Sequence, residues 1–295
     1  MIKGIDVSEN NGVINFKKVK DQGYDFVMIR ATFGRHKEDR NFRKNIISAY
    51  NQGLKVGVYY YSYALSEAQG VEEVDFFLKT INPFKEMITY PVVIDMEDSD
   101  KYKEKNGFPS NEILCKIVKN ATERISTAGY YSMCYASASW YKDKLNTKEM
   151  DNVSKWIAWW DIGESAIDKT KYQMWQKSSK ARIEGIETNV DEDIAFVEFD
   201  KLINYLENIR KIQEIKLKTG LEDITIQFIS CYKYGQEAIN KLYLGLQKPK
   251  LKNPTENIHK VVQKFFGYED KTIKFFENYI YGEQLFLKLY KAICE

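Results

Sequence analysis

The sequence predicts an α/β fold, a (β/α) barrel of the irregular, incomplete TIM type, followed by a small all-α helical domain. Over residues 1–200, short apolar runs alternate with amphipathic stretches of helical period, which is typical of a barrel in which strands and helices alternate. Beyond Phe199 the strand signals end and only helical periodicity continues. The rival is an open, doubly wound sheet, but that fold needs a glycine-rich phosphate loop after its first strand. The segment 6–12 (DVSENNG) lacks one.

Eight apolar segments of strand length predict the barrel wall. In chain order they are 3–7, 26–32, 56–63, 92–96, 130–135, 156–160, 172–176 and, most weakly, 193–197. Helical patterns separate the earlier strands, over 15–22, 40–52, 67–81, 110–128 and 140–145. Gly53 and Gly129 stand where a helix would end before the next strand. Few helical signals lie between the last strands, so the barrel is expected to lack some late helices.

The predicted domains are a barrel over 1–200, a linker helix over 201–218 and a helical domain over 219–295. Beyond the barrel, helical periodicity predicts helices over 200–217, 221–246, 254–266 and 270–293. The segment 248–254 (KPKLKNP) is a clear break between two of them. No repeat of 20–50 residues is evident, which disfavours tandem β-repeat modules of the kind that bind cell walls.

Composition excludes several classes of protein. No stretch approaches the roughly 18 apolar residues that span a membrane, so no membrane insertion is expected. The first residues run into a strand pattern without an apolar signal region. We therefore expect a protein made in the cytoplasm without a signal peptide, which reaches any extracellular target after release by another route.

Cysteine and histidine are too few and too scattered for a metal site. The four cysteines have no C-x-x-C spacing, which argues against zinc and against a disulfide scaffold, and the two histidines are far apart in sequence. A Ser-His-Asp triad is improbable for the same reason. The sequence thus predicts no metal and no cofactor, and it predicts acid–base chemistry that depends on carboxylates.

Charge is uneven along the chain. Residues 201–295 hold 16 Lys and Arg against 11 Asp and Glu, whereas residues 1–200 hold 28 against 31. A basic tail beside an acidic body suggests a polyanionic partner such as a cell envelope, and no nucleic-acid partner is expected. A merely solvated surface explains so small an excess equally well.

The strongest local signal is the segment 90–98 (YPVVIDMED), in which an apolar run ends in acidic residues. Asp95 and Glu97 stand two positions apart and are expected to project from the same side of one strand. In a barrel the carboxyl ends of the strands form the active-site face. Two carboxyl groups this close favour one protonated and one ionised member, which glycosidic cleavage requires. A solvated acidic loop is the alternative.

Two further acids belong to the same prediction. Asp6 ends the first strand and Asp191 lies at the last strand signal. Because closure of a barrel makes its first and last strands neighbours, Asp6 and Asp191 are expected to meet across the seam, and with Asp95 and Glu97 they would form a group of four acids.

Aromatic residues near the strand ends are candidates for sugar contacts, since their faces stack on sugar C–H surfaces and tyrosine hydroxyls bond sugar oxygens. The candidates are Tyr59, Tyr61, Tyr135, Trp160 and Trp175. Packing explains many aromatic side chains in a protein with 14% aromatic residues, so both interpretations stay open. Arg30 is expected to pair with a carboxylate of the site or of the ligand, and a structural ion pair is an equal alternative.

An ordered set of segments resembles the Chalaropsis-type lysozymes, glycoside hydrolase family 25. The resemblance covers about residues 1–197 and rests on GIDVS (4–8) with Gly12, FVMIRAT (26–32), GVYYYSY (57–63), the Asp95-x-Glu97 pair, WIA (156–158), MWQ (174–176) and VD (190–191). Two features depart from the family pattern: the segment 9–11 (ENN), and Asp193 where an Asn is common.

The resemblance implies an incomplete barrel that hydrolyses the β-1,4 bond between N-acetylmuramic acid and N-acetylglucosamine in peptidoglycan. By position, Glu97 matches the general acid and Asp95 its partner, which orients the 2-acetamido group or stabilises an oxocarbenium-like centre. Asp6 and Asp191 match the other two acids. The resemblance leaves open whether the route is substrate-assisted or a direct displacement.

Domain order, a muramidase followed by a small module, resembles that of phage endolysins. It implies lysis of a Gram-positive host and a helical domain that binds the cell wall and is a candidate for homodimerisation. The alternatives are a structural extension packed on the barrel, a hydrolase that cuts on the N-acetylglucosamine side or in chitin, and a non-catalytic wall-binding protein on a decayed barrel.

Overall fold

The computed structural model describes residues 1–252 and 254–294. Asn253, in the predicted break between helices, and the terminal Glu295 of the predicted helical domain lie outside the described residues. The chain divides into two compact units, Met1–Ile203 and Asn204–Glu295. Among the helices of the described residues, none is both long enough and apolar enough to cross a membrane.

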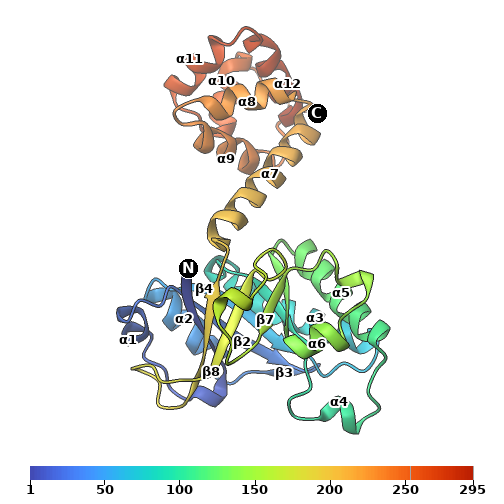
Figure 1. The fold of residues 1–295 in the computed structure, drawn as a ribbon. Helices are drawn as coiled ribbons and strands as arrows, with labels where there is room; N and C mark the ends of the chain where they lie inside the picture. Colours follow the sequence, from blue (N-terminus) through green and yellow to red (C-terminus); the bar gives the residue numbers. More distant parts are fainter. Residues whose placement is uncertain (253, 295) are drawn as a thin grey trace. The chain divides into compact units, whose positions relative to one another are not determined.

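The first unit is a closed barrel with helices on its outside (Figure 1). Its sheet has the order β1-β9-β8-β7-β6-β5-β4-β2-β3, and a parallel pairing of β1 with β2 closes the ring. The strands are β1 (Ile2–Val7), β2 (Phe26–Phe33), β3 (Lys37–Glu38), β4 (Lys55–Tyr61), β5 (Val92–Asp95), β6 (Ser132–Ser137), β7 (Lys155–Ala158), β8 (Met174–Ala181) and β9 (Val190–Ala195). The short β3 pairs only with β2, outside the eight-stranded ring, and it was not predicted.

The last strand runs against its neighbours, since β9 is antiparallel to both β8 and β1. It spans Val190–Ala195 rather than the predicted 193–197. Because of this reversal, the first residues of β9 lie at the same end of the barrel as the last residues of β1. Asp6 and Asp191 are direct cross-strand partners. The reversed strand therefore brings its acidic residues to the barrel end at which the parallel strands finish.

The outer helices confirm the predicted incomplete barrel. They are α1 (Phe16–Asp21), α2 (Phe42–Asn51), α3 (Glu67–Ile81), α4 (Tyr102–Lys105), α5 (Asn111–Thr127) and α6 (Ala138–Asp143). Within the described barrel residues, no α-helix separates β7 from β8 or β8 from β9. The one-turn helix α4 was not predicted, because four residues are too few to give a periodic signal.

Strand alternation creates two cores. Side chains such as Ile5, Ile94 and Met96 point outward and pack under the helices. Side chains such as Phe26 and Trp156 point into the barrel and fill it. At Gly4 a Cβ atom would lie 2.3 Å from the ring of Phe26, so the strand needs glycine there for the ring to enter the barrel. The interior is thus packed at one end, and its polar residues lie at the other.

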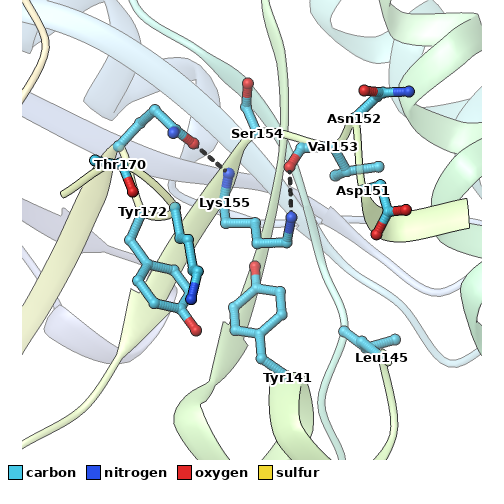
Figure 2. Close-up of a pocket in the computed structure, with 11 residues that line it drawn as sticks. Tyr141, Leu145, Asp151, Asn152, Val153, Ser154, Lys155, Thr170 and Tyr172 are labelled. Carbon is cyan, nitrogen blue, oxygen red and sulfur yellow. Dashed lines mark hydrogen bonds between the residues drawn. The ribbon is translucent and has the colours of Figure 1, made fainter. Parts of the chain in front are cut away.

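A hollow of about 360 Å³ lies at the amino end of β7, away from those polar residues (Figure 2). Lys155 lines it, but its ammonium group donates to the carbonyls of Met150 (2.7 Å) and Val153 (3.1 Å). The backbone N–H of Lys155 donates to Oε1 of Gln173 at 2.8 Å. Lys155 therefore holds the loop before β7 in place, and its role at this hollow is structural.

The second unit is helical, as predicted, but two of the predicted helices are each two helices. Its helices are the end of α7 (Phe199–Thr219), then α8 (Asp223–Cys231), α9 (Gly235–Gly245), α10 (Ile258–Phe266), α11 (Asp270–Glu277) and α12 (Gly282–Cys294) (Figure 1). The predicted helices 221–246 and 270–293 are wrong in this respect. Gly235 and Gly282 begin new helices, and a Cβ there would lie 2.4 Å and 2.6 Å from the carbonyl oxygens of Ile229 and Phe276.

The equivalent breaks reveal an internal repeat, so the expectation that no repeat exists is wrong. Residues 222–243 and 269–290, offset by 47 positions, carry the same residue at 11 of 22 positions. Helices α8 and α9 correspond in this way to α11 and α12. The repeat is made of helices, so it is not one of the β-repeat modules that the sequence disfavoured.

The two copies pack through a symmetric stack of aromatic rings. Phe228 and Phe275, at equivalent positions, stack with centroids 4.4 Å apart and planes 4° apart. Phe228 also stacks on Tyr279, and Phe275 stacks on Tyr232, and both pairs have a 4.0 Å separation and a 15° tilt. Tyr279 and Tyr232 are themselves equivalent positions. These matched contacts define an approximate two-fold axis through the Phe228–Phe275 stack.

Candidate active site

Strands far apart in the sequence of the barrel unit bring acidic residues to one end of the barrel interior. Asp6 on β1 and Asp95 on β5 are each only 5% exposed, and Asp193 on β9 is fully buried. Asp6 faces Asp191 directly, and Gly4 faces Asp193 two pairs further along the same ladder. Asp193 points into the barrel, where its Oδ1 accepts a bond from the indole N–H of Trp156 at 3.0 Å.

The predicted pair lies where β5 ends. Asp95 is its last residue, Met96 turns into the outer core, and half-buried Glu97 follows beyond the strand. Glu97 is therefore not a strand residue, but alternation still directs it to the side of Asp95. Burial raises the pKa of Asp95 well above its usual value, and the charge of Glu97 raises it further. Burial likewise raises the pKa of Glu97 to about 7.

The acids of the β1–β9 seam also hold protons unusually strongly. Burial raises the pKa of Asp6 well above its ordinary range, and the charges of Asp191 and Asp193 add to the effect. Burial raises the pKa of Asp191 to about 6. The pKa of Asp193 is also raised, first by burial and then by Asp191. Because these carboxyl groups lie close together and are shielded from solvent, each charge opposes the ionisation of the others.

Gln176 on β8 connects three of the predicted residues. Its Nε2 donates to Oδ2 of Asp6 at 2.8 Å. Its Oε1 accepts bonds from the hydroxyl of Tyr135 and from the indole Nε1 of Trp160, both at 3.0 Å. Gln176 is 2% exposed, and it was not predicted as a site residue. No local pattern distinguishes it, because most of the residues that follow it on β8 are polar as well.

The three predicted tyrosines lie on β4 and β6, the two strands that flank β5. Tyr59 packs inside it, where burial, and next the charge of Asp6, raise the pKa of its hydroxyl well above the usual value. The hydroxyl of Tyr61 lies 3.3 Å from Oγ of Ser99, just beyond Glu97. All three, including Tyr135, are less than 10% exposed.

The two predicted tryptophans lie in different surroundings. Trp160 follows the end of β7 and is 47% exposed, so its ring is open to a ligand while its Nε1 holds Gln176. Trp175 points instead into the outer core, is 4% exposed, and donates through Nε1 to the carbonyl of Trp159 at 2.8 Å. Strand alternation explains the difference, because Trp175 precedes the inward-facing Gln176.

Arg30 makes the structural ion pair that the sequence left open. Its Nε donates to Oδ2 of the buried Asp39 at 2.9 Å, and its Nη2 lies 3.8 Å from Oε1 of Glu9. It remains near the acids as well, because its charge lowers the pKa of Asp95 against the effect of burial. Within residues 1–252 and 254–294, no group of three His, Cys, Asp or Glu side chains is arranged to hold a metal ion.

A barrel end that holds several buried acids with raised pKa values, flanked by aromatic side chains, is typical of carboxylate-dependent glycosidases. Comparison with known proteins gives the family. The model of the glycosyl hydrolases family 25 matches residues 5–186, and the chain belongs to this family. It is therefore a glycoside hydrolase.

Individual relatives are similar over roughly two thirds to three quarters of the chain. The chain is 29% identical to the autolytic lysozyme of Clostridium acetobutylicum over 232 residues, which are 75% of this chain and 67% of that protein. It is 26% identical to lysozyme M1 of Streptomyces globisporus over 197 residues, 65% and 67% of the two chains. The crystal structure of a bacterial lysozyme from Streptomyces coelicolor has the same fold, with a TM-score of 0.58, 24% identity and coverage of 68% and 95%.

Proposed function

We propose that the protein is a lysozyme, an N-acetylmuramidase that hydrolyses the β-1,4 bond between N-acetylmuramic acid and N-acetylglucosamine in peptidoglycan. The observation that carries the proposal is the pKa of about 7 at Glu97, beside the more deeply buried Asp95. A carboxyl group with this pKa is still protonated near neutral pH and can donate to a leaving oxygen. The names of the lysozyme relatives support the choice of substrate.

In the proposed reaction Glu97 gives its proton to the glycosidic oxygen as the C1–O bond breaks. Asp95 orients the 2-acetamido group of the muramic sugar or stabilises the positive charge that develops at C1. A water molecule then adds to C1, and its proton returns to the Glu97 carboxylate, so that the enzyme is restored. Asp6 and Asp191 hold the sugar and adjust the charge of the site. Substrate-assisted and direct displacement routes both fit these roles.

The aromatic residues and Arg30 supply the proposed sugar contacts. Trp160 offers the most exposed ring, while Tyr59, Tyr61 and Tyr135 line the approach to the acids. Trp175 acts in this scheme through the backbone of Trp159, which it holds from behind. The charge of Arg30 on β2 lowers the pKa of Asp95, and its guanidinium group is suited to the lactyl carboxylate of the muramic sugar.

The test is the Glu97→Gln variant, which keeps the shape of the acid and removes its proton. Clearing of purified cell walls, followed by turbidity, should fall by roughly 100-fold or more, because general acid catalysis contributes about that much. The wild-type rate should decline above about pH 7, where Glu97 loses its proton. Retention of full clearing by Glu97→Gln would reject Glu97 as the acid.

Product analysis tests the bond that is cut. Mass spectrometry of digested peptidoglycan should find new reducing ends on N-acetylmuramic acid. New reducing ends on N-acetylglucosamine, or activity on chitin alone, would instead support the alternative hydrolase. Intact walls after prolonged digestion would favour a non-catalytic wall-binding protein.

We also propose the finer assignment to a phage endolysin that lyses a Gram-positive host. In this proposal the protein is made in the cytoplasm, is released by a membrane-permeabilising partner, and binds the wall through its helical unit. The excess of basic residues beyond residue 200 supports the attraction to a polyanionic wall. Homodimerisation through the helical unit belongs to the same proposal.

The helical unit has a hydrophobic core of its own, so the chain can be shortened between the two units. The full-length Glu97→Gln variant should sediment with Gram-positive walls, and the same variant ending at Ile203 should stay in solution. Equal sedimentation of both chains would remove the wall-binding assignment. Analytical ultracentrifugation of the full chain, which distinguishes a monomer from a dimer, tests the self-association.

A further inference from the structure

A buried lysine lies under the loop that carries Glu97. Lys103 belongs to α4, within the excursion that leaves the barrel after β5. The local sequence 101–105 (KYKEK) holds three lysines, and the outer two are exposed, whereas Lys103 is fully buried. Burial of an ammonium group is costly unless its donors and charge are satisfied, so the contacts of this residue need an explanation.

The ammonium of Lys103 joins two neighbouring segments of the barrel end. It donates to the backbone carbonyl of Ser62, just beyond β4, at 2.5 Å. It also donates to the backbone carbonyl of Glu97 itself at 2.7 Å. The ring of Tyr61 lies 5.7 Å from the ammonium, within the range of a cation–π contact. Lys103 therefore fastens the backbone of the proposed acid to the end of the adjacent strand.

The residue after Glu97 closes the same loop from the other side. The carboxylate of Asp98 accepts a bond from the N–H of Lys103 at 2.7 Å and another from the N–H of Glu104 at 2.9 Å. Both N–H groups lie in the first turn of α4 and have no partner inside the helix. Asp98 thus fixes α4 so that the Lys103 side chain points back under Glu97.

Glu73 on α3 balances the buried charge. It is 1% exposed, and its carboxylate accepts bonds from the hydroxyl of Ser62 at 2.6 Å and from the N–H of Tyr63 at 2.9 Å. Burial raises the pKa of Glu73 to about 7, and the charge of Lys103 opposes this rise. Ser62 consequently lies between the two charges, with its hydroxyl on the carboxylate and its carbonyl on the ammonium.

Lys103 also acts on the carboxyl group of Glu97. Burial is the largest cause of the raised pKa of Glu97, and the charge of Lys103 is the largest influence that opposes it. Asp191 and Asp100 raise the pKa further, while a bond from Ser99 lowers it. Burial lowers the pKa of Lys103 itself, against the charges of Glu73, Asp95, Asp98 and Asp100.

We infer that Lys103 is a positioning residue for the reaction: its buried ammonium fastens the backbone of Glu97 to the end of β4 and places a fixed positive charge beneath the acid. The inference rests on the proposed function of Glu97. It adds a residue that contacts no substrate and yet determines both the position of the acid and the pH range in which it works.

The first test is the pH dependence of wall clearing by Lys103→Met and Lys103→Gln. Either change removes the positive charge, so Glu97 should keep its proton to higher pH, and the basic limb of kcat/KM should move up by about one pH unit. Met also removes the two bonds to carbonyls, so kcat should fall by roughly 10-fold or more. Gln keeps a donor, so its loss of kcat should be smaller than that of Met.

Lys105→Met, two residues away on the same helix, is the matched control, because Lys105 is exposed. Its pH profile should equal that of the wild type. A basic limb that stays in place in both Lys103 variants would overturn the inference, unless the carboxyl group of Glu97 itself titrates at a higher pH in these variants. If Lys103→Met does not fold, as seen by circular dichroism, Lys103→Gln decides the result, since it changes the volume and the bonds less.

A second measurement separates this inference from the proposed function. Titration of the Glu97 carboxyl carbon by ¹³C NMR, assigned by its loss in Glu97→Gln, reports its protonation without any substrate. A shift in this titration without a shift in the kinetic limb would support Lys103 and reject Glu97 as the acid. If neither the kinetic limb nor the titration shifts, Lys103 has no positioning role for Glu97.

Discussion

The barrel end and the helical unit are assembled in opposite ways. At the barrel end, single residues from strands at both ends of the unit converge, and each occupies a different environment. Asp6 and Asp191 are direct partners although 185 positions separate them in the chain. In the helical unit two copies of one segment meet, and equivalent residues such as Phe228 and Phe275 make equivalent contacts. A chemical site needs unlike neighbours, whereas a stable interface can be built from like ones.

This difference also explains what the sequence predicted. Asp95 and Glu97 stand two positions apart at the end of an apolar strand. In the structure both side chains point to the same side, as this spacing predicted. The ordered family segments then placed Asp6 and Asp191 with them. The roles of all four acids remain predictions, but their meeting at one end of the barrel followed from strand order and closure.

Residues that act through tertiary contacts gave no local signal. Gln176 is an ordinary polar residue until β8 turns it toward Asp6 and Tyr135. Lys103 is one of three lysines in five residues, and only the path of the loop buries it. The helical repeat escaped detection because its identical residues are dispersed over 222–243 and 269–290, where they match helix packing rather than a short motif.

The largest expected effect concerns the unlike neighbours at the barrel end. In Gln176→Leu the Asp6 carboxylate loses its donor, and the hydroxyl of Tyr135 and the indole of Trp160 lose their acceptor. We expect wall clearing to fall by about 100-fold, since small displacements of reacting groups have effects of that order. Initial rates of turbidity loss at saturating wall concentration measure the change.

Gln173→Leu serves as the matched control for that variant. Gln173 precedes the same strand, but its Oε1 accepts the N–H of Lys155 at the opposite end of the barrel. It should lower the melting temperature without lowering the specific activity. If the two glutamine variants lose activity to the same extent, the hydrogen bonds of Gln176 at the site are not needed for the reaction.

The next effect concerns the like neighbours of the helical unit. Phe228→Ala and Phe275→Ala each remove a half-buried ring from the centre of the stack. We expect each change to lower the free energy of unfolding of this unit by roughly 2–3 kcal/mol, toward the low end for aromatic residues because the rings are only half-buried. The two losses should agree closely, because the contacts are symmetric. Chemical denaturation of the full chain, followed by circular dichroism, measures both.

The double variant with both phenylalanine changes tests whether the two rings stabilise the helical unit through each other. Since the rings contact each other, the double variant should lose less stability than the sum of the single variants. Activity on a short soluble glycan should remain, because the barrel is a separate compact unit. Additive losses, or single losses that differ by more than about 1 kcal/mol, would show that the approximate symmetry has no energetic counterpart.

The smallest expected effect concerns one buried carboxylate oxygen at the barrel end, Oδ2 of Asp193. Oδ1 of the fully buried Asp193 accepts the indole N–H of Trp156 at 3.0 Å, while its Oδ2 has no partner among the described residues. Asp193→Asn keeps the acceptor for Trp156 and adds an amide N–H donor on the side of Asp6. This donor takes the place of the proton that the Asp193 carboxyl group has to retain when it is buried. We expect a gain of about 1 kcal/mol in stability at pH 7, the usual scale for satisfying a buried polar atom.

The pH dependence of that gain identifies its cause. The pKa of Asp193 is raised in the folded protein, so above about pH 4 the folded state still binds a proton that the unfolded chain has lost. The wild type therefore loses stability as the pH rises above the unfolded pKa of about 4. Asn carries no such proton. The advantage of Asp193→Asn should therefore be present at neutral pH and shrink to nothing below about pH 4, in urea unfolding of the two proteins side by side. An advantage that is the same at pH 4 and pH 7 would mean that packing, rather than the buried acid, distinguishes the two side chains.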